Sequence, residues 1–512
     1  MVPVYVMAAA GYIEIMKSRQ LALSAYLNTP PLAMLLGLYV FVWMAAQLVS
    51  HTNFDPYGDM LENFIWGQTF AWGNPKHPPL LGWVTGIWFD VMPHAQAFYY
   101  LLAYGNAALG LVGIYYLGLT LKLNAISRPA TLLMILALPY STLAMKFNAN
   151  TILLALWPWI AVAWLVGLDA NQRRRKRWLS GIVLGVLAAL GMLAKYYTGV
   201  LLLSLTLITV LTPQGRAYLK TLAPWLALTV FLLVLGPHVW WLTNNNFASL
   251  GYVAAQGDGA VNFKQLGKFA LTPFGYWLLP FLAIVLLTPG RRLTMLWQAW
   301  LPAERGDLLF WLAVTPYLVT LLFGVSGFVS LSSPWAIPLG FPLTLLWLRN
   351  ITQRQGLAGN EGLNSRAQNT FLGFFIVVLI LSPVYAWYKG TRGIENYYLP
   401  IIEAVQQTEH LFPDYAWVSG DYADAAAVVF YGTAKARYVA NISSQPTSNG
   451  LIFCHLGLVA EARRSNICTQ RAEAWIRQRK DKVTTAEFTV VKAGPRFSLH
   501  QPHAYRVYFY QH

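Results

Sequence analysis

Four polar residues between positions 51 and 94 have side chains suited to binding an anionic group and to general-base catalysis. Asp59 and Glu62 are three residues apart, which places both carboxylates on one face of a helix. A carboxylate in this setting could act as a general base. Lys76 and His77 follow, and basic side chains of this kind could bind an anionic head group. The alternative interpretation is a surface helix whose acids are merely solvated.

Three later segments add amides and aromatic rings, which suit a sugar, and another lysine, which suits an anionic head group. The residues concerned are Asn148, Asn150, Lys195, Tyr196, His238 and Trp241. Most of these also have a structural interpretation. The asparagines could cap the following helix, the lysine could extend to the membrane interface, the histidine could be hydrogen-bonded there, and the tryptophan could belong to an aromatic belt. The functional interpretation depends on all of them meeting at one place.

The composition indicates which elements must position these residues. Of the 512 residues, 56% are hydrophobic and only 11% are charged, against about 25% charged in a typical soluble domain. This excludes a disordered chain, a fibrous chain and an ordinary cytosolic enzyme, and it indicates a helical protein that crosses a membrane many times. The 2 cysteines are too few for a disulfide scaffold or a multi-cysteine zinc site.

Eleven apolar segments are candidates for spanning helices, which need roughly 20 mostly apolar residues. Their interiors contain almost no charged side chains. The fifth and sixth are short, so one or two segments could be re-entrant. The segments are 31–50, 95–121, 128–145, 150–169, 179–194, 196–212, 222–243, 269–288, 308–328, 332–348 and 369–388.

The distribution of basic residues indicates the orientation. With the N-terminus and its Lys17 and Arg19 in the cytoplasm, the inner segments hold 17 Lys and Arg residues, whereas the outer loops before residue 389 hold 5. Cytoplasmic loops characteristically carry this excess. The bias also explains much of the net charge of +16, so no nucleic-acid partner is needed. The first outer loop, 51–94, and all the other candidate residues then lie at the outer face.

Residues 389–512 are more polar and are expected to form a small α/β domain outside the membrane, after a membrane domain over 1–388. Cys454 and Cys468 both lie in it. An oxidising compartment favours a disulfide between them, with two free thiols as the alternative. The expected strands are 427–431, 436–441, 451–457, 485–492 and 504–510, with helices near 398–410 and 469–480.

The stretch from Asp59 to Trp83, DMLENFIWGQTFAWGNPKHPPLLGW, resembles the first outer loop of the GT-C glycosyltransferases. It is similar to the bacterial branch related to the aminoarabinose transferase of lipid A and to protein O-mannosyltransferases. The resemblance covers the chain in outline and implies a multispanning GT-C domain with a smaller domain on the outer face. It also implies transfer of a sugar from a polyprenyl-phosphate donor to an acceptor outside the cytoplasm.

The family pattern implies roles for matching residues of the first loop. An essential acid opens the family's loop and matches Asp59. The family often has a second acid directly after it, but Met60 holds that position here, and Glu62 stands one helical turn later. A basic residue before a proline contacts the donor phosphate in the family. His77 holds that place, with Lys76 beside it.

Later family positions match less uniformly. Lys195, in MLAKYYTG, matches a family lysine after the fifth span and implies phosphate binding. The family often has an Asp after its second outer loop, whereas KFNANT supplies Asn148 and Asn150, so no second base is evident there. The stretch PHVWWLTNNNF, with His238 and Trp241, resembles a family segment without a fixed role.

The resemblance and the residue types together imply a single displacement that inverts the sugar. Asp59 would take the proton of the acceptor hydroxyl, while Lys195, His77 and Lys76 neutralise the departing polyprenyl phosphate. The sequence contains no nucleotide-binding Gly-rich loop, which fits a lipid-linked donor. A divalent metal at Asp59 and Glu62 is left open, because too few clear ligands are present to assign one.

The expected setting is a bacterial inner membrane, with membrane lipids around the spans and the C-terminal domain in the periplasm. The expected acceptor is a lipid or glycan, with lipid A, lipopolysaccharide or another envelope glycan favoured. Two other function classes are alternatives. A secondary transporter would carry its site near the bilayer midplane in repeated, broken helices. A non-catalytic membrane scaffold would tolerate replacement of Asp59.

Overall fold

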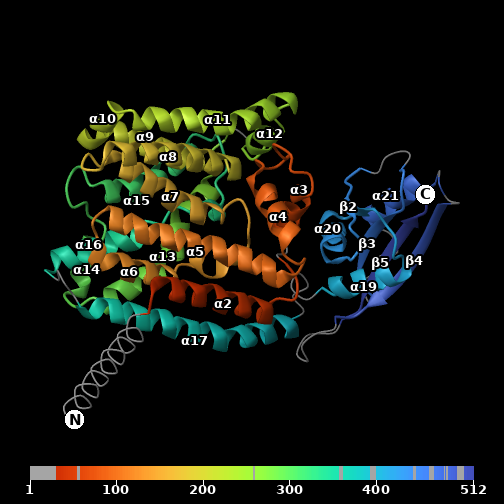
Figure 1. Ribbon diagram of the computed structural model, residues 1–512. Coiled ribbons are helices and arrows are strands. Elements are labelled where there is room, and N and C mark those ends of the chain that lie inside the picture. The colour runs from red at the N-terminus through yellow and green to blue at the C-terminus, as the bar shows by residue number, and fades with distance from the viewer. Residues whose placement is uncertain are drawn as a thin grey trace, which may run out of the picture.

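The computed structural model describes residues 30–54, 58–257, 260–356, 361–392, 399–441, 446–459, 466–477, 479, 482–492 and 501–512. A bundle of helices forms one part of the protein and a small sheet domain forms the other (Figure 1). This confirms the expected fold class of a mainly α membrane protein with a C-terminal α/β domain. Lys17 and Arg19 lie outside the described residues.

Seven helices in the described part are long and apolar enough to cross a membrane. Each coincides with an expected span, because an uncharged apolar run in lipid can satisfy its backbone only through its own helical hydrogen bonds. They are α2 (Leu32–Ser50), α5 (Gln96–Thr120), α8 (Arg174–Ala194), α11 (Ala223–Asn244), α13 (Phe263–Leu287), α15 (Leu308–Val325) and α17 (Glu361–Thr391).

Two of the other expected spans form shorter helices. The segment 196–212 is α9 (Thr198–Leu211), and a bend of 100° separates it from α10 (Pro213–Leu219). If this bent pair is one span, the described part has eight spans rather than the expected eleven. The segment 150–169 forms α7 (Leu153–Leu168), whose 16 residues fall short of the spanning length.

The last two expected spans are broken into short pieces. Prolines stand at these breaks, where their missing N–H costs no helical hydrogen bond. Pro139 lies in the break of 128–145, and Pro338 and Pro342 lie in the break of 332–348. The pieces are α6 (Asn124–Met134), η1 (Leu138–Tyr140) and η2 (Thr142–Met145) in the first segment, and η3 (Ser333–Ala336) and α16 (Leu343–Arg354) in the second.

The connections between the helices separate into two ends of the bundle, as the distribution of basic residues predicts. The short helices α10 and α14 (Arg292–Gln298) and the helix α16 lie at one end in Figure 1. The helices α3 (Asp59–Gly67), α4 (Leu80–Val91) and α12 (Ala248–Ala254) lie at the other, beside the sheet domain. The basic loops and the candidate site residues are therefore at opposite ends.

The helices α3 and α4 approach each other so closely that their backbones touch. A Cβ on Gly67 would lie 2.6 Å from the backbone nitrogen of Gly86, and one on Gly82 would lie 2.9 Å from Cβ of Trp66. Glycine is the residue that permits such an approach. Asn63 continues the attachment by donating a 2.7 Å hydrogen bond to the carbonyl of Phe147. The helix that begins with Asp59 is thus held from two directions.

The C-terminal domain is a five-stranded mixed sheet in the order β2-β1-β3-β5-β4. Strand β1 is parallel to β2 and β3, and β5 is antiparallel to β3 and β4. Its elements are α19 (Ile401–Leu411), β1 (Trp417–Gly420), α20 (Tyr422–Tyr431), β2 (Arg437–Tyr438), β3 (Gly450–Leu458), α21 (Ile467–Ile476), β4 (Val483–Val490) and β5 (His503–Tyr510).

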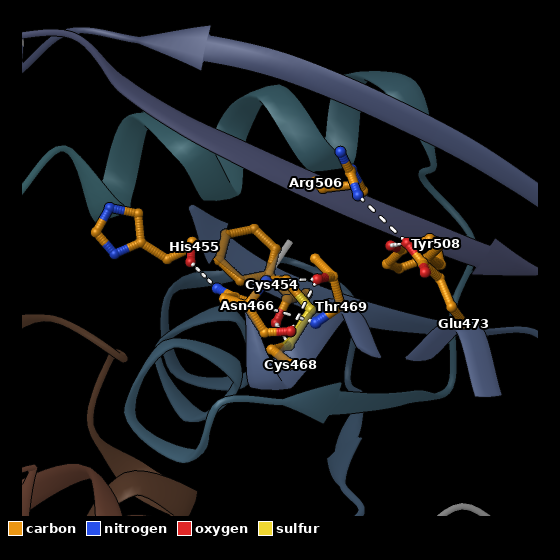
Figure 2. Close-up of a disulfide and its surroundings, with 9 residues drawn as sticks. Cys454, His455, Asn466, Cys468, Thr469, Glu473, Arg506 and Tyr508 are labelled. Carbon is orange, nitrogen blue, oxygen red and sulfur yellow. Dashed lines mark hydrogen bonds and ion pairs between the residues drawn. A yellow bond between two sulfur atoms is a disulfide. The ribbon is translucent and has the colours of Figure 1, made fainter. Parts of the chain in front are cut away.

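One expected strand of this domain is wrong. Residues 427–431 belong to α20, because the three alanines 425–427 favour a helix and the β-branched pair that follows is accommodated in it. The four-residue strand β1 was not expected. Cys454 of β3 and Cys468 of α21 form a disulfide with a Cα–Cα distance of 5.7 Å (Figure 2).

Candidate functional site

A cavity of about 650 Å³ lies at the end of the bundle that faces the sheet domain. Its walls come from the first loop, the loop before α7, the turn between α8 and α9, the helices α12 and α15, and the segment before α16. Six candidates from the sequence line it: Asp59, Lys76, His77, Asn150, Lys195 and Tyr196. Segments that are far apart in the chain therefore meet, as the functional interpretation requires.

Lys76 lies between the two acids of α3. Its Nζ is 2.8 Å from Oε2 of Glu62 and 3.6 Å from Oδ1 of Asp59. Asn148 donates from Nδ2 to Oδ2 of Asp59 at 3.2 Å. Glu62 and Asn148 do not line the cavity themselves, but each contacts a residue that does. The acids also stand in the first turn of α3, where the helix dipole stabilises negative charge.

The two lysines of the cavity differ in their surroundings. Lys195 donates a hydrogen bond to Oδ1 of Asn150 and lies 5.0 Å from the ring centre of Trp335. Burial lowers the pKa of Lys195 to about 7, and the charge of Asp59 only partly offsets it. Burial also acts to lower the pKa of Lys76, but the hydrogen bond and charge of Glu62, with the charge of Asp59, raise it above its ordinary value.

His77 enters the cavity as a neutral imidazole, whereas the sequence suggested a cation. Burial, together with the positive charges of Lys195 and Lys76, lowers the pKa of His77 to about 3. Its ring meets the rings of Trp66 and Tyr252 edge to face, with centroids 5.9 Å apart in both pairs. A neutral imidazole can still donate one hydrogen bond to a ligand oxygen.

His238 and Trp241 were expected to contact substrate, but they do not line the cavity. His238 Nδ1 is 2.6 Å from the carbonyl oxygen of Trp72, which can only accept. Nδ1 is therefore the protonated nitrogen, and Nε2 accepts from the hydroxyl of Tyr196 at 2.7 Å. Trp241 stacks on His238 and covers Gly73. Both residues therefore contact the first loop, at Trp72 and Gly73.

Several cavity residues were missed in the sequence. Trp335 is the clearest case, because it was placed inside an expected span and lies instead on η3, where the chain is broken. The prolines of SSPWAIP were the available signal. Other such residues are Tyr197, Tyr252, Gln256, Thr320 and Ser332.

The described residues contain no group of three or more His, Cys, Asp or Glu side chains that could hold a metal ion. The ammonium of Lys76 occupies the space between Asp59 and Glu62 that was left open for a divalent metal. The ammonium thus offsets one of the two negative charges.

Comparisons with known proteins agree with this architecture. The family model for dolichyl-phosphate-mannose-protein mannosyltransferase matches residues 76–241. The crystal structure of ArnT from Cupriavidus metallidurans bound to undecaprenyl phosphate is similar with a TM-score of 0.58 at 14% identity, covering 93% of this chain and 97% of that one. The apo structure of the same protein has a TM-score of 0.54 at 14% identity, covering 95% and 98%.

A third solved structure is the apo oligosaccharyltransferase of Archaeoglobus fulgidus, with a TM-score of 0.38 at 12% identity. The match covers 81% of this chain and 65% of that one. A search among curated proteins by sequence finds no match. The likeness to ArnT over nearly the whole of both chains shows a shared fold. The family model matches the part of the chain that contains Lys76, His77 and Lys195.

Proposed function

We propose that this chain, with its GT-C fold, transfers a sugar from a polyprenyl-phosphate donor to an acceptor at the outer face of a bacterial inner membrane. The observation that carries the proposal is the meeting of Asp59, Lys76, His77 and Lys195 around one cavity. The structure of ArnT with undecaprenyl phosphate supports a polyprenyl donor. The distribution of basic residues supports an orientation with the N-terminus in the cytoplasm and the C-terminal domain in the periplasm.

The donor phosphate would bind between the two lysines. Its oxygens would replace Asn150 as the partner of Lys195 and the carboxylates as partners of Lys76. Both ammonium groups lie in a partly buried cavity, where water screens charge less and an ion pair with phosphate is stronger than in solution. His77 would donate a neutral hydrogen bond to the same phosphate. Charge would therefore be neutralised where the leaving group develops it.

Asp59 would serve as the general base once Lys76 has turned to the phosphate. The oxygen of the acceptor hydroxyl forms a bond to the anomeric carbon, the bond from that carbon to the phosphate oxygen breaks, and the hydroxyl proton passes to Asp59. Polyprenyl phosphate leaves with the bonding electrons, and the anomeric configuration inverts. A general base of this kind contributes about 10²–10⁴-fold to the rate.

The acceptor we favour is lipid A, lipopolysaccharide or another envelope glycan, since the cavity opens at the same end as the outer domain and the fold is similar to that of ArnT. A protein hydroxyl is the second candidate, and the name of the matched family supports it. Both acceptors present a hydroxyl to Asp59, so the chemistry at the site is the same.

The experiment is mass spectrometry of envelope lipids, polysaccharides and proteins from cells with and without the chain, beside cells that carry Asp59→Asn. A sugar-sized mass difference that appears only with the wild-type chain supports the proposal and identifies the acceptor. A difference that persists with Asp59→Asn contradicts it and favours transport or a scaffold role. Release of polyprenyl phosphate by the purified protein is the matching test in vitro.

A further inference from the structure

We propose that the C-terminal domain is a working part of the transferase site, because it holds the acid-bearing helix α3 in position. The inference rests on the proposed function and concerns residues that do not touch the substrate. Three contacts between α3 and the domain carry it, one at each end of the helix and one in the middle. Together they fix the helix whose first residue is Asp59.

The first contact lies directly before the catalytic acid. Gly58 has a φ of 71°, the left-handed conformation that favours glycine. A Cβ at this position would lie 3.5 Å from Cβ of Ala423, the second residue of α20. The backbone turn that starts α3 therefore lies so close to the domain that even a methyl group there would touch it. The side chain of Asp59 follows from this turn.

The second contact is at the other end of α3. Gln68 donates from Nε2 to the carbonyl of Ala436 at 3.3 Å and accepts from the backbone N–H of Tyr438 at 3.5 Å. Strand β2 is at the edge of the sheet, and its other backbone groups pair with β1. The amide of Gln68 therefore forms its hydrogen bonds on the outer side of this edge strand, where the backbone groups have no neighbouring strand.

The third contact is an aromatic cluster in the middle of the interface. Phe430 of α20 is fully buried and meets Phe64 of α3 edge to face, with ring centroids 5.0 Å apart. It makes similar contacts with Phe54 and with Phe89 of α4. Edge-to-face pairs of this kind add directional stabilisation to the burial of apolar area. Phe430 thus joins the domain to both helices of the first loop.

Charge also couples the domain to the acids. Burial raises the pKa of Tyr422, at the start of α20, and the negative charge of Glu62 raises it further. The phenol of Tyr422 therefore remains neutral beside Glu62. The face of α3 that carries the acids has Lys76 and the cavity on one side and the domain on the other, so a shift of the domain would move the base relative to the acceptor.

Two variants loosen this interface without touching the cavity. Gln68→Ala removes both hydrogen bonds to β2, and Phe430→Leu removes the ring contacts but keeps an apolar side chain. The matched control is Glu487→Gln, which removes an exposed ion pair with Arg506 on β4 and β5 of the same domain. The measurements are kcat for release of polyprenyl phosphate, the Kd for undecaprenyl phosphate, and hydrogen–deuterium exchange of the α3 amides.

We expect both variants to lower kcat by about tenfold or more, because small displacements of a reacting group are that costly. The Kd should stay at the wild-type value, since Lys195 and Lys76 lie neither on α3 nor in the C-terminal domain, and the α3 amides should exchange faster. The control should match the wild type in all three measurements. If Phe430→Leu does not fold, Gln68→Ala carries the test alone, because its side chain is only partly buried.

A wild-type kcat in the variants, with faster exchange in α3, would overturn the inference. An equal loss of kcat in Glu487→Gln would also overturn the inference, since a substitution away from the α3 contacts would then lower kcat as much as one at them. Failure of the proposed function has a different signature, because the wild-type protein would release no polyprenyl phosphate or would do so without needing Asp59.

Discussion

The side chain of Asn148 donates to Oδ2 of Asp59 at 3.2 Å, although 89 residues separate them in the sequence. Asn148 is itself held, since its Oδ1 accepts hydrogen bonds from the backbone N–H groups of Asn150 and Thr151. The second oxygen of Asp59 then lies toward Lys76, 3.6 Å away. The amide of Asn148 thus orients Asp59, the proposed base, without adding a second carboxylate beside it.

Asp59→Asn should abolish transfer while the protein stays folded. The amide keeps the shape and can still bond to Asn148, but it cannot take a proton, so we expect a loss of about 10²–10⁴-fold in kcat. Turnover of a polyprenyl-phosphate sugar and thermal stability of the purified variant are the measurements. Turnover at the wild-type rate would remove the general-base role from Asp59.

Lys195→Ala should weaken donor binding. The variant loses an ammonium group that lies among Asn150, Tyr197 and Trp335 in the cavity, and charge-assisted bonds to phosphate are among the stronger polar contacts. Removing such a bond should raise the Kd for undecaprenyl phosphate by about tenfold or more. Binding measured by calorimetry in detergent checks this, with Lys264→Ala at the start of α13 as the control. An unchanged Kd would argue against a phosphate contact.

Donor affinity should fall as the pH rises above about 7. Burial lowers the pKa of Lys195 to about 7, so the ammonium that binds phosphate is fully present below this pH and is lost as the pH rises through it. Bound phosphate stabilises the charged form, and the affinity therefore falls by up to about tenfold per pH unit until the pKa of the complex is reached. A polyprenyl phosphodiester is the suitable probe, because its own charge stays constant. Lys195→Arg should bind without this pH dependence, and an equal slope in both proteins would refute the assignment.

His238→Phe should destabilise the first loop more than it affects the chemistry. The variant keeps a ring to stack on Trp241 but removes the donor to the carbonyl of Trp72 and leaves the hydroxyl of Tyr196 with Ser249 alone. A buried polar group that is left unsatisfied costs about 1–3 kcal/mol of stability. Thermal unfolding compared with His238→Gln, which can restore part of the hydrogen bonding, is the check. Wild-type stability with weaker donor binding would instead make His238 a substrate contact.

Labelling of single cysteines should show that the site faces outward. A cysteine placed within 244–262 should react with an impermeant reagent from outside the cell, whereas one within 170–178 should not. The background is suitable because the 2 native cysteines are joined in a disulfide. The reverse pattern would invert the orientation and place the cavity in the cytoplasm.

The sequence predicted the features that depend on local composition. The seven long helices follow from uncharged apolar runs, and the helical spacing of Asp59 and Glu62 correctly puts both acids in the first turn of α3. The convergence of Asp59, His77 and Lys195 could also be predicted, because alternate loops of a spanning protein lie at the same end.

The sequence did not predict features that depend on partners far away in the chain. His238 was expected to contact substrate because it is polar and lies near the outer end of a span. It does not line the cavity, and its ring nitrogens bond to Tyr196 and to the carbonyl of Trp72. Trp335 was not predicted to line the cavity, because it lies in the apolar segment 332–348, which was expected to be a spanning helix. The residues 427–431 of α20 were misassigned because the three alanines 425–427 favour a helix, and packing of Phe430 against Phe64 of α3 adds to that preference.

The close contact of α3 and α4 through Gly67, Gly82 and Gly86 has a bearing on genetics. A single nucleotide change that puts serine, alanine or aspartate at one of these glycines would wedge the two helices apart and displace Asp59 without altering any cavity residue. A screen for loss-of-function alleles should therefore recover these positions alongside the charged ones. Natural variants at the three glycines should be scored as damaging even though none of them meets the substrate.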